Sequence, residues 1–142
     1  MYEDLSALGV DIVDLKLKAN IAIAFFDDFL VIDCDKCKTS AQERTVLAHE
    51  AGHYLSGAFY HAYSPYEVKE QAEYKALAAS YEKYLPPDKI EAAMRAGYTE
   101  SWQLAEYFDL DEDYIKKPCT IGRREPPQIV RTAQKSPPSR KY

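Results

Sequence analysis

The stretch of residues 41–59 constrains this fold most, because it predicts one long helix that carries two histidines on the same face. Ser40, followed three residues later by Glu43, is typical of a capping box, so the helix is expected to start directly after Ser40. The stretch contains no proline that would interrupt it. His49 and His53 are four residues apart and therefore lie one turn apart on one helix face. They are either an incidental pair or two ligands of one metal ion.

The sequence around this helix predicts an α+β domain, in which a small sheet or hairpin packs on mainly helical elements. Residues 21–33 are rich in Ile, Val and Phe around a central Asp-Asp pair, which indicates a hairpin with strands 21–26 and 29–33. The preceding residues, 5–18, suggest only a short helix or an irregular lead-in. Prolines and a glycine separate the later helices, which we expect over residues 66–85, 88–97, 99–108 and 109–117.

Charge divides the chain into a main domain, residues 1–117, and a tail, residues 118–142. From residue 116 to the end there are eight basic residues against one acid, a net charge of +7 in a chain whose total is −5. Five of the eight prolines also lie there, so we expect a basic, proline-rich, disordered tail. The tail carries no recognisable nucleic-acid-binding motif, and direct nucleic-acid binding is not expected.

Within the main domain, residues 88–117 form a helical module that invites comparison with a DNA-binding helix-turn-helix. Eight acids against four basic residues give the module a net charge of −4, whereas a recognition helix that approaches phosphates is expected to be basic. We therefore interpret it as a packing module. Its buried face is expected to comprise Trp102, Leu104, Ala105, Phe108 and Ile115.

Neither the N-terminal sequence nor the cysteine content favours export. The first residues lack the basic-then-apolar order of a secretory signal and include Glu3 and Asp4. No apolar run is long enough to span a membrane. The three cysteines include one C-x-x-C pair, Cys34 and Cys37, with no second pair to complete a zinc knuckle. We therefore expect a cytoplasmic protein with free thiols and no membrane partner.

His49, Glu50 and His53 form an H-E-x-x-H pattern, which we interpret as the centre of a zinc hydrolase site. The two imidazoles would bind zinc, and Glu50, one position further round the helix, would face a water molecule as the general base. A catalytic zinc ion needs a third protein ligand. The longer H-x-x-G-x-x-H extension is excluded, because positions 56 and 59 are Ser and Phe.

The third ligand is expected on the next predicted helix, which offers three glutamates. Glu73 is followed three residues later by Ala76, and a small side chain there lets two helices approach closely, as short zinc bonds require. Glu73 is therefore favoured and Glu70 is the alternative. His61 is a poor ligand, because eight residues past His53 it is turned away from the metal face.

A hydrolase that attacks a carbonyl group also needs a hydrogen-bond donor for the oxyanion of the tetrahedral intermediate. Tyr60, His61, Tyr63 and Tyr66 are near enough in sequence to supply one. Of these four, we take His61 and Tyr63 as the candidate oxyanion donors.

The stretch LAHEAGHYLSG, a glutamate twenty residues after the second histidine, and EYKALAASYEKYLPP together resemble the ImmA/IrrE family of metallo-endopeptidases. In that family the helix of the third ligand typically reads E-x-x-A-x-x-(aromatic)-A and is followed by a proline. Glu73, Ala76 and Pro86 fall on those places. Ala79 and Ser80 depart from the pattern, since they stand where an aromatic residue and an alanine are usual.

The resemblance covers residues 20–117 and implies a gluzincin-like, cytoplasmic endopeptidase of the phage or mobile-element type. It implies that His49, His53 and Glu73 bind the metal and that Glu50 is the catalytic acid and base. The metal is expected to be zinc, one ion per chain, with manganese as an alternative. Family members cleave repressors of prophages, mobile elements or stress genes. The implied partner is therefore a separate helix-turn-helix repressor, whose cleavage relieves repression.

A regulatory binding module is the alternative interpretation. Such a protein would keep the metal site but sequester a repressor partner with little proteolysis. Glu50 favours the enzyme, because a purely structural metal site has no use for a base beside its ligands and usually fills all four positions with protein groups.

Overall fold

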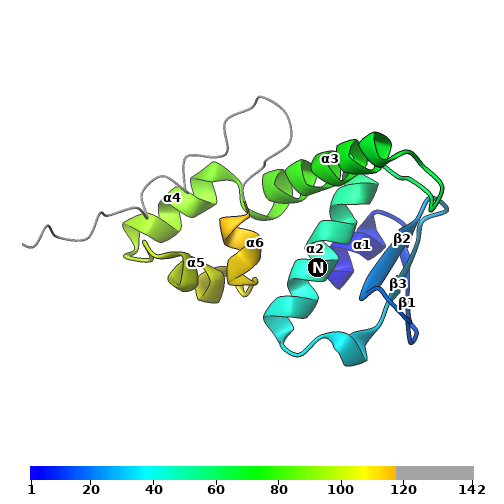
Figure 1. The fold of residues 1–142 in the computed structure, drawn as a ribbon. Coiled ribbons are helices and arrows are strands. Elements are labelled where there is room, and N and C mark those ends of the chain that lie inside the picture. The colour runs from blue at the N-terminus through cyan, green and yellow to red at the C-terminus, as the bar shows by residue number, and fades with distance from the viewer. Residues whose placement is uncertain (118–142) are drawn as a thin grey trace, which may run out of the picture.

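The computed structural model describes residues 1–117, and the tail predicted for residues 118–142 lies outside the described residues. The described part is α+β, as predicted, with a three-stranded sheet and mainly helical surroundings (Figure 1). Its elements are, in order, α1 (Tyr2–Ala7), β1 (Asp11–Asp14), β2 (Ala22–Phe25), β3 (Phe29–Ile32), a short 3-10 turn η1 (Cys34–Lys36), α2 (Ser40–Ser56), α3 (Tyr66–Tyr84), α4 (Pro87–Arg95), α5 (Ser101–Phe108) and α6 (Glu112–Lys116). Across residues 1–117, no helix combines the length and the apolar character that crossing a bilayer requires.

The sheet combines the predicted hairpin with a third strand that the sequence analysis missed. β2 and β3 pair antiparallel, with Ala22 opposite Ile32 and Phe25 opposite Phe29, around a turn in which Asp28 has a φ of 56°. The segment expected to be an irregular lead-in instead forms α1 and then β1, which pairs parallel with β3. The strand order β1-β3-β2 leaves β2 at an edge of the sheet, beside α2.

Both ends of α2 differ from the prediction by a few residues. The N-cap is Thr39, whose side-chain oxygen accepts a hydrogen bond from the Gln42 amide, so the predicted Ser40 cap lies one residue too late. Gly57 ends the helix in the left-handed region, at a φ of 65°, which glycine adopts without a Cβ clash. The helix therefore stops at Ser56, three residues before the expected end.

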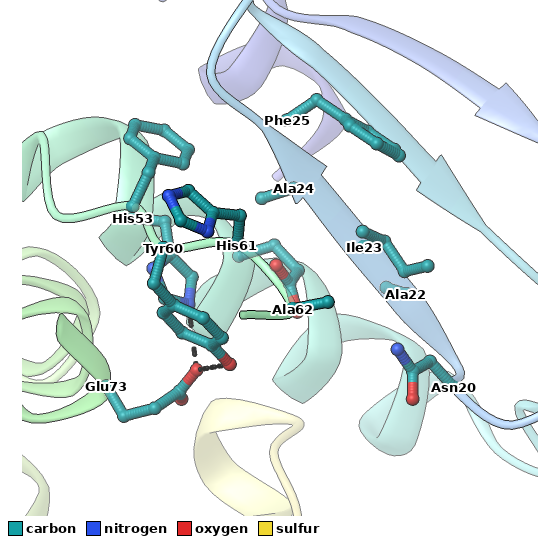
Figure 2. A pocket seen from close by; sticks show the side chains of 12 residues that line it. Asn20, Ala22, Ile23, Ala24, Phe25, His53, Tyr60, His61, Ala62 and Glu73 are labelled. Carbon is teal, nitrogen blue, oxygen red and sulfur yellow. Dashed lines mark hydrogen bonds and ion pairs between the residues drawn. The ribbon is translucent and has the colours of Figure 1, made fainter. Parts of the chain in front are cut away.

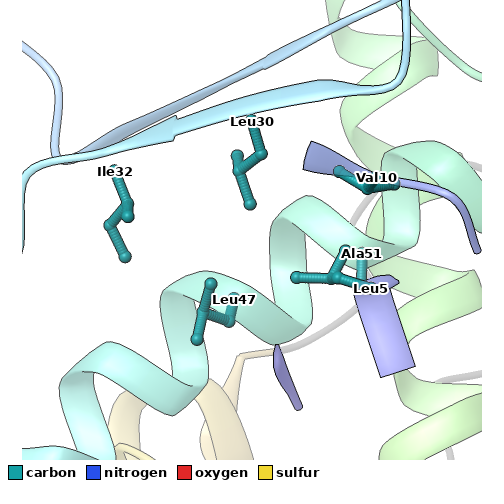
Figure 3. Close-up of a cluster of buried hydrophobic side chains, with 6 residues drawn as sticks. All are labelled: Leu5, Val10, Leu30, Ile32, Leu47 and Ala51. Atoms are coloured by element: carbon teal, nitrogen blue, oxygen red, sulfur yellow. The ribbon is translucent and has the colours of Figure 1, made fainter. Parts of the chain in front are cut away.

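α2 separates two apolar clusters and contributes to both. On the sheet side, Leu47 and Ala51 pack against α1, β3 and the residue before β1 (Figure 3). The other members of this cluster are Leu5, Val10, Leu30 and Ile32. On the other side, Ala48 packs against the later helices, in a cluster completed by Leu77, Leu85, Ile90, Leu110 and Tyr114. Burial on two faces fixes α2 relative to the sheet and to the later helices, because displacing it would expose both clusters to water.

The helical module, residues 88–117, lies on the side of α2 opposite the sheet (Figure 1). Leu104 and Ala105 are buried, as predicted, and Phe108 is partly buried against the second cluster. Ile115 also packs against that cluster. Trp102 is 55% exposed, so its predicted burial is wrong. At about 100° per residue, position 102 projects away from the face that positions 104 and 108 share.

Polar contacts dock the module on α3 and on the start of α2. The hydroxyls of Ser80 and Tyr114 are 2.6 Å apart in the interior between α3 and α6. The Tyr81 hydroxyl donates to the carbonyl oxygen of Tyr114 at 2.6 Å. The backbone amide of Asp111, just before α6, donates to Thr45 Oγ1 of α2 at 2.8 Å. The loop before α6 and α6 itself are thereby held beside the histidine-bearing helix.

Candidate metal centre

Three side chains from two helices meet beside the sheet. His49 and His53 of α2 and Glu73 of α3 place ligand atoms that all lie within 4.8 Å of one another. His49 Nε2 is 2.9 Å from Glu73 Oε2, and His53 Nε2 is 3.5 Å from Glu73 Oε1. His53 is buried, whereas His49 and Glu73 are partly exposed. Two imidazole nitrogens and a carboxylate oxygen suit a divalent metal ion by donor type, and their spacing lets one ion contact all three.

Small residues allow α2 and α3 to approach closely enough for this meeting. A Cβ atom added at Gly52 would lie 2.0 Å from the carbonyl oxygen of Ala76, far inside van der Waals contact. Ala48 and Ala72 are buried as well. Ala76 is the small residue that led us to favour Glu73. Gly52, inside the H-E-x-x-H pattern, is the small residue of α2 that faces Ala76. The spacing of the histidines alone did not reveal this contact.

The other candidate groups lie apart from these three side chains. The Glu70 carboxylate accepts a hydrogen bond from the Tyr66 hydroxyl at 2.8 Å and is not in the group of three. Cys34 and Cys37 are free cysteines, as expected. Burial raises the pKa of both thiols. Neither thiol belongs to the group formed by His49, His53 and Glu73.

His53 is oriented by the loop that follows α2. Its Nδ1 atom lies 2.7 Å from the carbonyl oxygen of Ala58, which only accepts hydrogen bonds, so Nδ1 carries the proton and donates. Nε2 is thereby directed at Glu73 and is the ring atom available to a metal. Burial acts to lower the pKa of His53, but the hydrogen bonds with Glu73 and Ala58 outweigh it and the pKa is raised. Reciprocally, the hydrogen bonds with His49 and His53 lower the pKa of the Glu73 carboxyl.

Glu50 lies beside the three side chains without belonging to their group. It lines both of the cavities that open at the site. Burial raises the pKa of its carboxyl, against the opposing influence of His49 and His53. A carboxyl with a raised pKa exchanges protons more readily near neutral pH than an ordinary glutamate does. The structure therefore puts Glu50 where a proton acceptor can serve chemistry at the three side chains.

Two cavities adjoin the three side chains, one lined by His53 and Glu73 and the other by His49. A cavity of about 460 Å³ extends toward β2, where Ile23 contributes apolar surface (Figure 2). Phe59, in the loop after α2, adds further apolar surface to it. A cavity of about 670 Å³ extends toward α6 and includes Asp111. Glu50 and Tyr60 line both. Both cavities therefore open beside the three side chains, and both are lined by Ala22 of the edge strand β2.

The two candidate oxyanion donors lie in different surroundings. His61 lines the cavity on the β2 side (Figure 2). Tyr63 is 96% exposed and lines neither cavity, so the structure does not bring it to the site. Tyr60 is at the site instead, and its hydroxyl donates to Glu73 Oε1 at 2.5 Å. That hydrogen bond, followed by burial, raises the pKa of Tyr60 to about 12. The sequence analysis named Tyr60 among four possible donors, but in a chain with twelve tyrosines it had no basis for preferring this one.

Comparisons with protein-family models, with curated proteins and with solved structures give no match for this chain. The resemblance to the ImmA/IrrE family therefore stays a prediction, and the site is interpreted from its own residues.

Proposed function

We propose that this protein is a zinc-dependent endopeptidase of the ImmA/IrrE type. The observation that carries the proposal is the meeting of His49, His53 and Glu73 from two helices, with Glu50 beside them and two cavities that adjoin them. Two histidines and a glutamate are the protein ligands of one class of catalytic zinc site, in which a further position is left for water or substrate. The open cavities next to the three side chains support a catalytic site over a closed structural one.

Each functional group of the chain has a distinct task in this proposal. His49, His53 and Glu73 hold the metal. A bound zinc ion supplies the positive charge that activates a water molecule and polarises the carbonyl group of the substrate. Glu50 accepts the proton of the attacking water and later delivers a proton to the leaving amine, a task that its raised pKa favours. The two cavities accommodate the polypeptide on either side of the cleaved bond.

We propose a phage or mobile-element repressor in the cytoplasm as the substrate. The support is the resemblance of LAHEAGHYLSG, and of the stretch EYKALAASYEKYLPP that begins at Glu73, to peptidases that cleave such repressors. Sequestration of the repressor without cleavage is the alternative, and Glu50 argues against it, because binding alone needs no proton acceptor at the metal.

Substitution of the base tests the enzyme and separates it from the alternative. Glu50→Gln keeps the shape of the side chain and removes the proton acceptor. We expect this variant to fold normally and to bind about one zinc ion per chain, as a three-ligand site does. We expect it to lose cleavage of a helix-turn-helix repressor encoded beside this chain's own gene. The measurement is metal content by elemental analysis, together with electrophoresis of the repressor after incubation.

Two variants are the controls for that experiment, one at a proposed metal ligand and one at a glutamate outside the group of three. His53→Ala should lose the metal, whereas Glu70→Ala should keep it, because Glu70 is engaged with Tyr66. Undiminished cleavage by Glu50→Gln would remove Glu50 from the mechanism. A stable complex with the repressor and no fragments from the unaltered protein would favour the binding module over the peptidase.

A further inference from the structure

Tyr60 occupies a position at the metal centre that the proposed function does not yet use. It lies in the loop between α2 and α3, and its side chain reaches back to the site, as the dashed line to Glu73 in Figure 2 shows. The Tyr60 ring centroid is 6.2 Å from that of His53, and the side chain lines both cavities. Tyr60 therefore contacts the metal-binding group where the two cavities meet.

The hydrogen bond from Tyr60 restricts how the Glu73 carboxylate can turn. Oε2 of the carboxylate lies 2.9 Å from His49 Nε2. Oε1 lies 3.5 Å from His53 Nε2 and also accepts a hydrogen bond from the Tyr60 hydroxyl at 2.5 Å. A glutamate side chain has three rotatable bonds, and Glu73 is only partly buried, so packing alone does not hold its carboxylate. A donor fixed by the loop lowers the number of orientations that the carboxylate adopts. Groups that orient a metal ligand in this way strengthen metal binding.

We propose that Tyr60 is a positioning residue of the metal centre, which holds the Glu73 carboxylate toward His49 and His53. This inference rests on the proposed metal site and adds a fourth residue that governs its affinity. Tyr60 acts through Glu73, so its loss weakens metal binding before any substrate is present.

The chain itself offers a matched control for this hydrogen bond. Tyr66 and Glu70 form a second tyrosine–glutamate pair, with 2.8 Å between the hydroxyl and Oε1, on α3 about one turn before Glu73. Glu70 is outside the metal-binding group. Tyr66→Phe removes the same kind of hydrogen bond from the same helix, so it reports the effect of such a loss on α3 in general.

The experiment is a zinc titration of the full chain in competition with a chromophoric chelator. Tyr60→Phe keeps the aromatic ring and removes only the hydroxyl. We expect it to bind zinc about 10-fold more weakly than the unaltered chain, at the lower end of the roughly 10–100-fold range for loss of a group that orients a ligand. Tyr66→Phe should bind zinc as the unaltered chain does. Circular dichroism and thermal unfolding without zinc check that each variant is folded.

The same Tyr60→Phe change, made in a protein that lacks the Glu73 carboxylate, distinguishes positioning of Glu73 from a general effect on the fold. Glu73→Ala removes the carboxylate, and adding Tyr60→Phe to it should cause no further loss of zinc affinity. Unchanged affinity in Tyr60→Phe alone, or an equal loss with and without the Glu73 carboxylate, would overturn the positioning of Glu73 and leave the metal site standing. Absence of zinc binding by the unaltered chain would overturn the metal site and this inference together.

Discussion

Gly52 determines how closely α2 and α3 approach, and thereby whether Glu73 can reach the two histidines. It lies between Glu50 and His53 in sequence, yet it faces the backbone of α3 at Ala76. The hydrogen atom of a glycine is the only side chain that this spacing admits. A residue without any functional group therefore sets the geometry in which His49, His53 and Glu73 meet.

Gly52→Ala is expected to destabilise the protein and to weaken zinc binding. The added Cβ would lie 2.0 Å from the carbonyl oxygen of Ala76, a backbone atom that only a shift of the helices can relieve. Overpacking of this kind costs typically about 1–3 kcal/mol in the free energy of unfolding. Separation of the helices also moves Glu73 away from the histidines. Thermal unfolding without zinc, followed by a zinc titration, measures both effects.

Gly57→Ala is the control for the change from glycine to alanine. Gly57 has a φ of 65°, and a Cβ there would meet nothing within 4 Å. The substitution therefore introduces backbone strain of about 1–2 kcal/mol without forcing the two helices apart. Zinc affinity should stay close to that of the unaltered chain. Full zinc affinity in Gly52→Ala would show that the helix contact does not govern the site.

Single residues differ in how far the sequence alone could assign them. His49, Glu50 and His53 were predictable, because one helix fixes their relative positions over a few residues. The choice of Glu73 as the third ligand depended on recognising a small residue one turn later in the same helix. Tyr60 was not selected, because its position follows from the path of the loop between two helices, which no short-range pattern encodes. Tyr63, three residues further along the same loop, lies in solvent.

At the scale of elements, the sequence predicted those that local patterns define, and it missed pairing between segments that are distant in sequence. The hairpin of β2 and β3 was predicted, since its two strands are apolar and adjacent in sequence. β1 was missed because it is four residues long, begins and ends with aspartate, and forms its ladder only with the distant β3. Gly57 ended α2 earlier than expected, and this also brought the following loop back over the site.

Ser80→Ala tests the docking of α6 on α3. The Ser80 and Tyr114 hydroxyls are 2.6 Å apart, and both side chains are buried. Loss of a buried hydrogen bond lowers the free energy of unfolding by about 1–3 kcal/mol when the remaining polar group loses a hydrogen-bond partner. We expect the free energy of unfolding to fall by about 1–2 kcal/mol. Zinc affinity should change little, since α2 and α3 supply the three ligands. Denaturant unfolding and a zinc titration measure the two quantities.

Ser6→Ala supplies the comparison for Ser80→Ala. Ser6 is an exposed serine of α1, where loss of the hydroxyl should alter stability by less than about 0.5 kcal/mol. Equal stability losses in the two variants would show that the contact between Ser80 and Tyr114 does not hold α6 in place.

At the scale of the whole molecule, the site forms where three parts of the chain join. The helix pair supplies the two histidines and the glutamate, β2 supplies one wall of the cavities, and the start of α6 supplies another through Asp111 and Asp113. α2 is packed on both faces and joins all three parts. The α+β class followed from the order of elements in the sequence, whereas this junction depends on contacts between distant segments that sequence patterns do not specify.

Removal of the tail tests whether residues 1–117 are sufficient for folding and for the metal centre. Both apolar clusters and all three proposed metal ligands lie within residues 1–117. A chain that ends at Lys117 should therefore fold, unfold at a similar temperature and bind zinc with the affinity of the full chain. Calorimetry and a zinc titration measure these properties. Failure of the shortened chain to fold would show that the tail packs on the domain and that the boundary at residue 117 is wrong.

The same truncation tests whether charge in the tail holds the substrate. Residues 118–142 carry six basic residues and one acid, so they contribute +5 and residues 1–117 contribute −10 to the total of −5. If the tail binds the repressor electrostatically, cleavage by the full chain should fall as salt rises, because salt screens exposed charges. Cleavage by the shortened chain should then be slower at low salt and nearly independent of salt. Equal rates and equal salt dependence in the two chains would exclude electrostatic binding of the repressor by the tail.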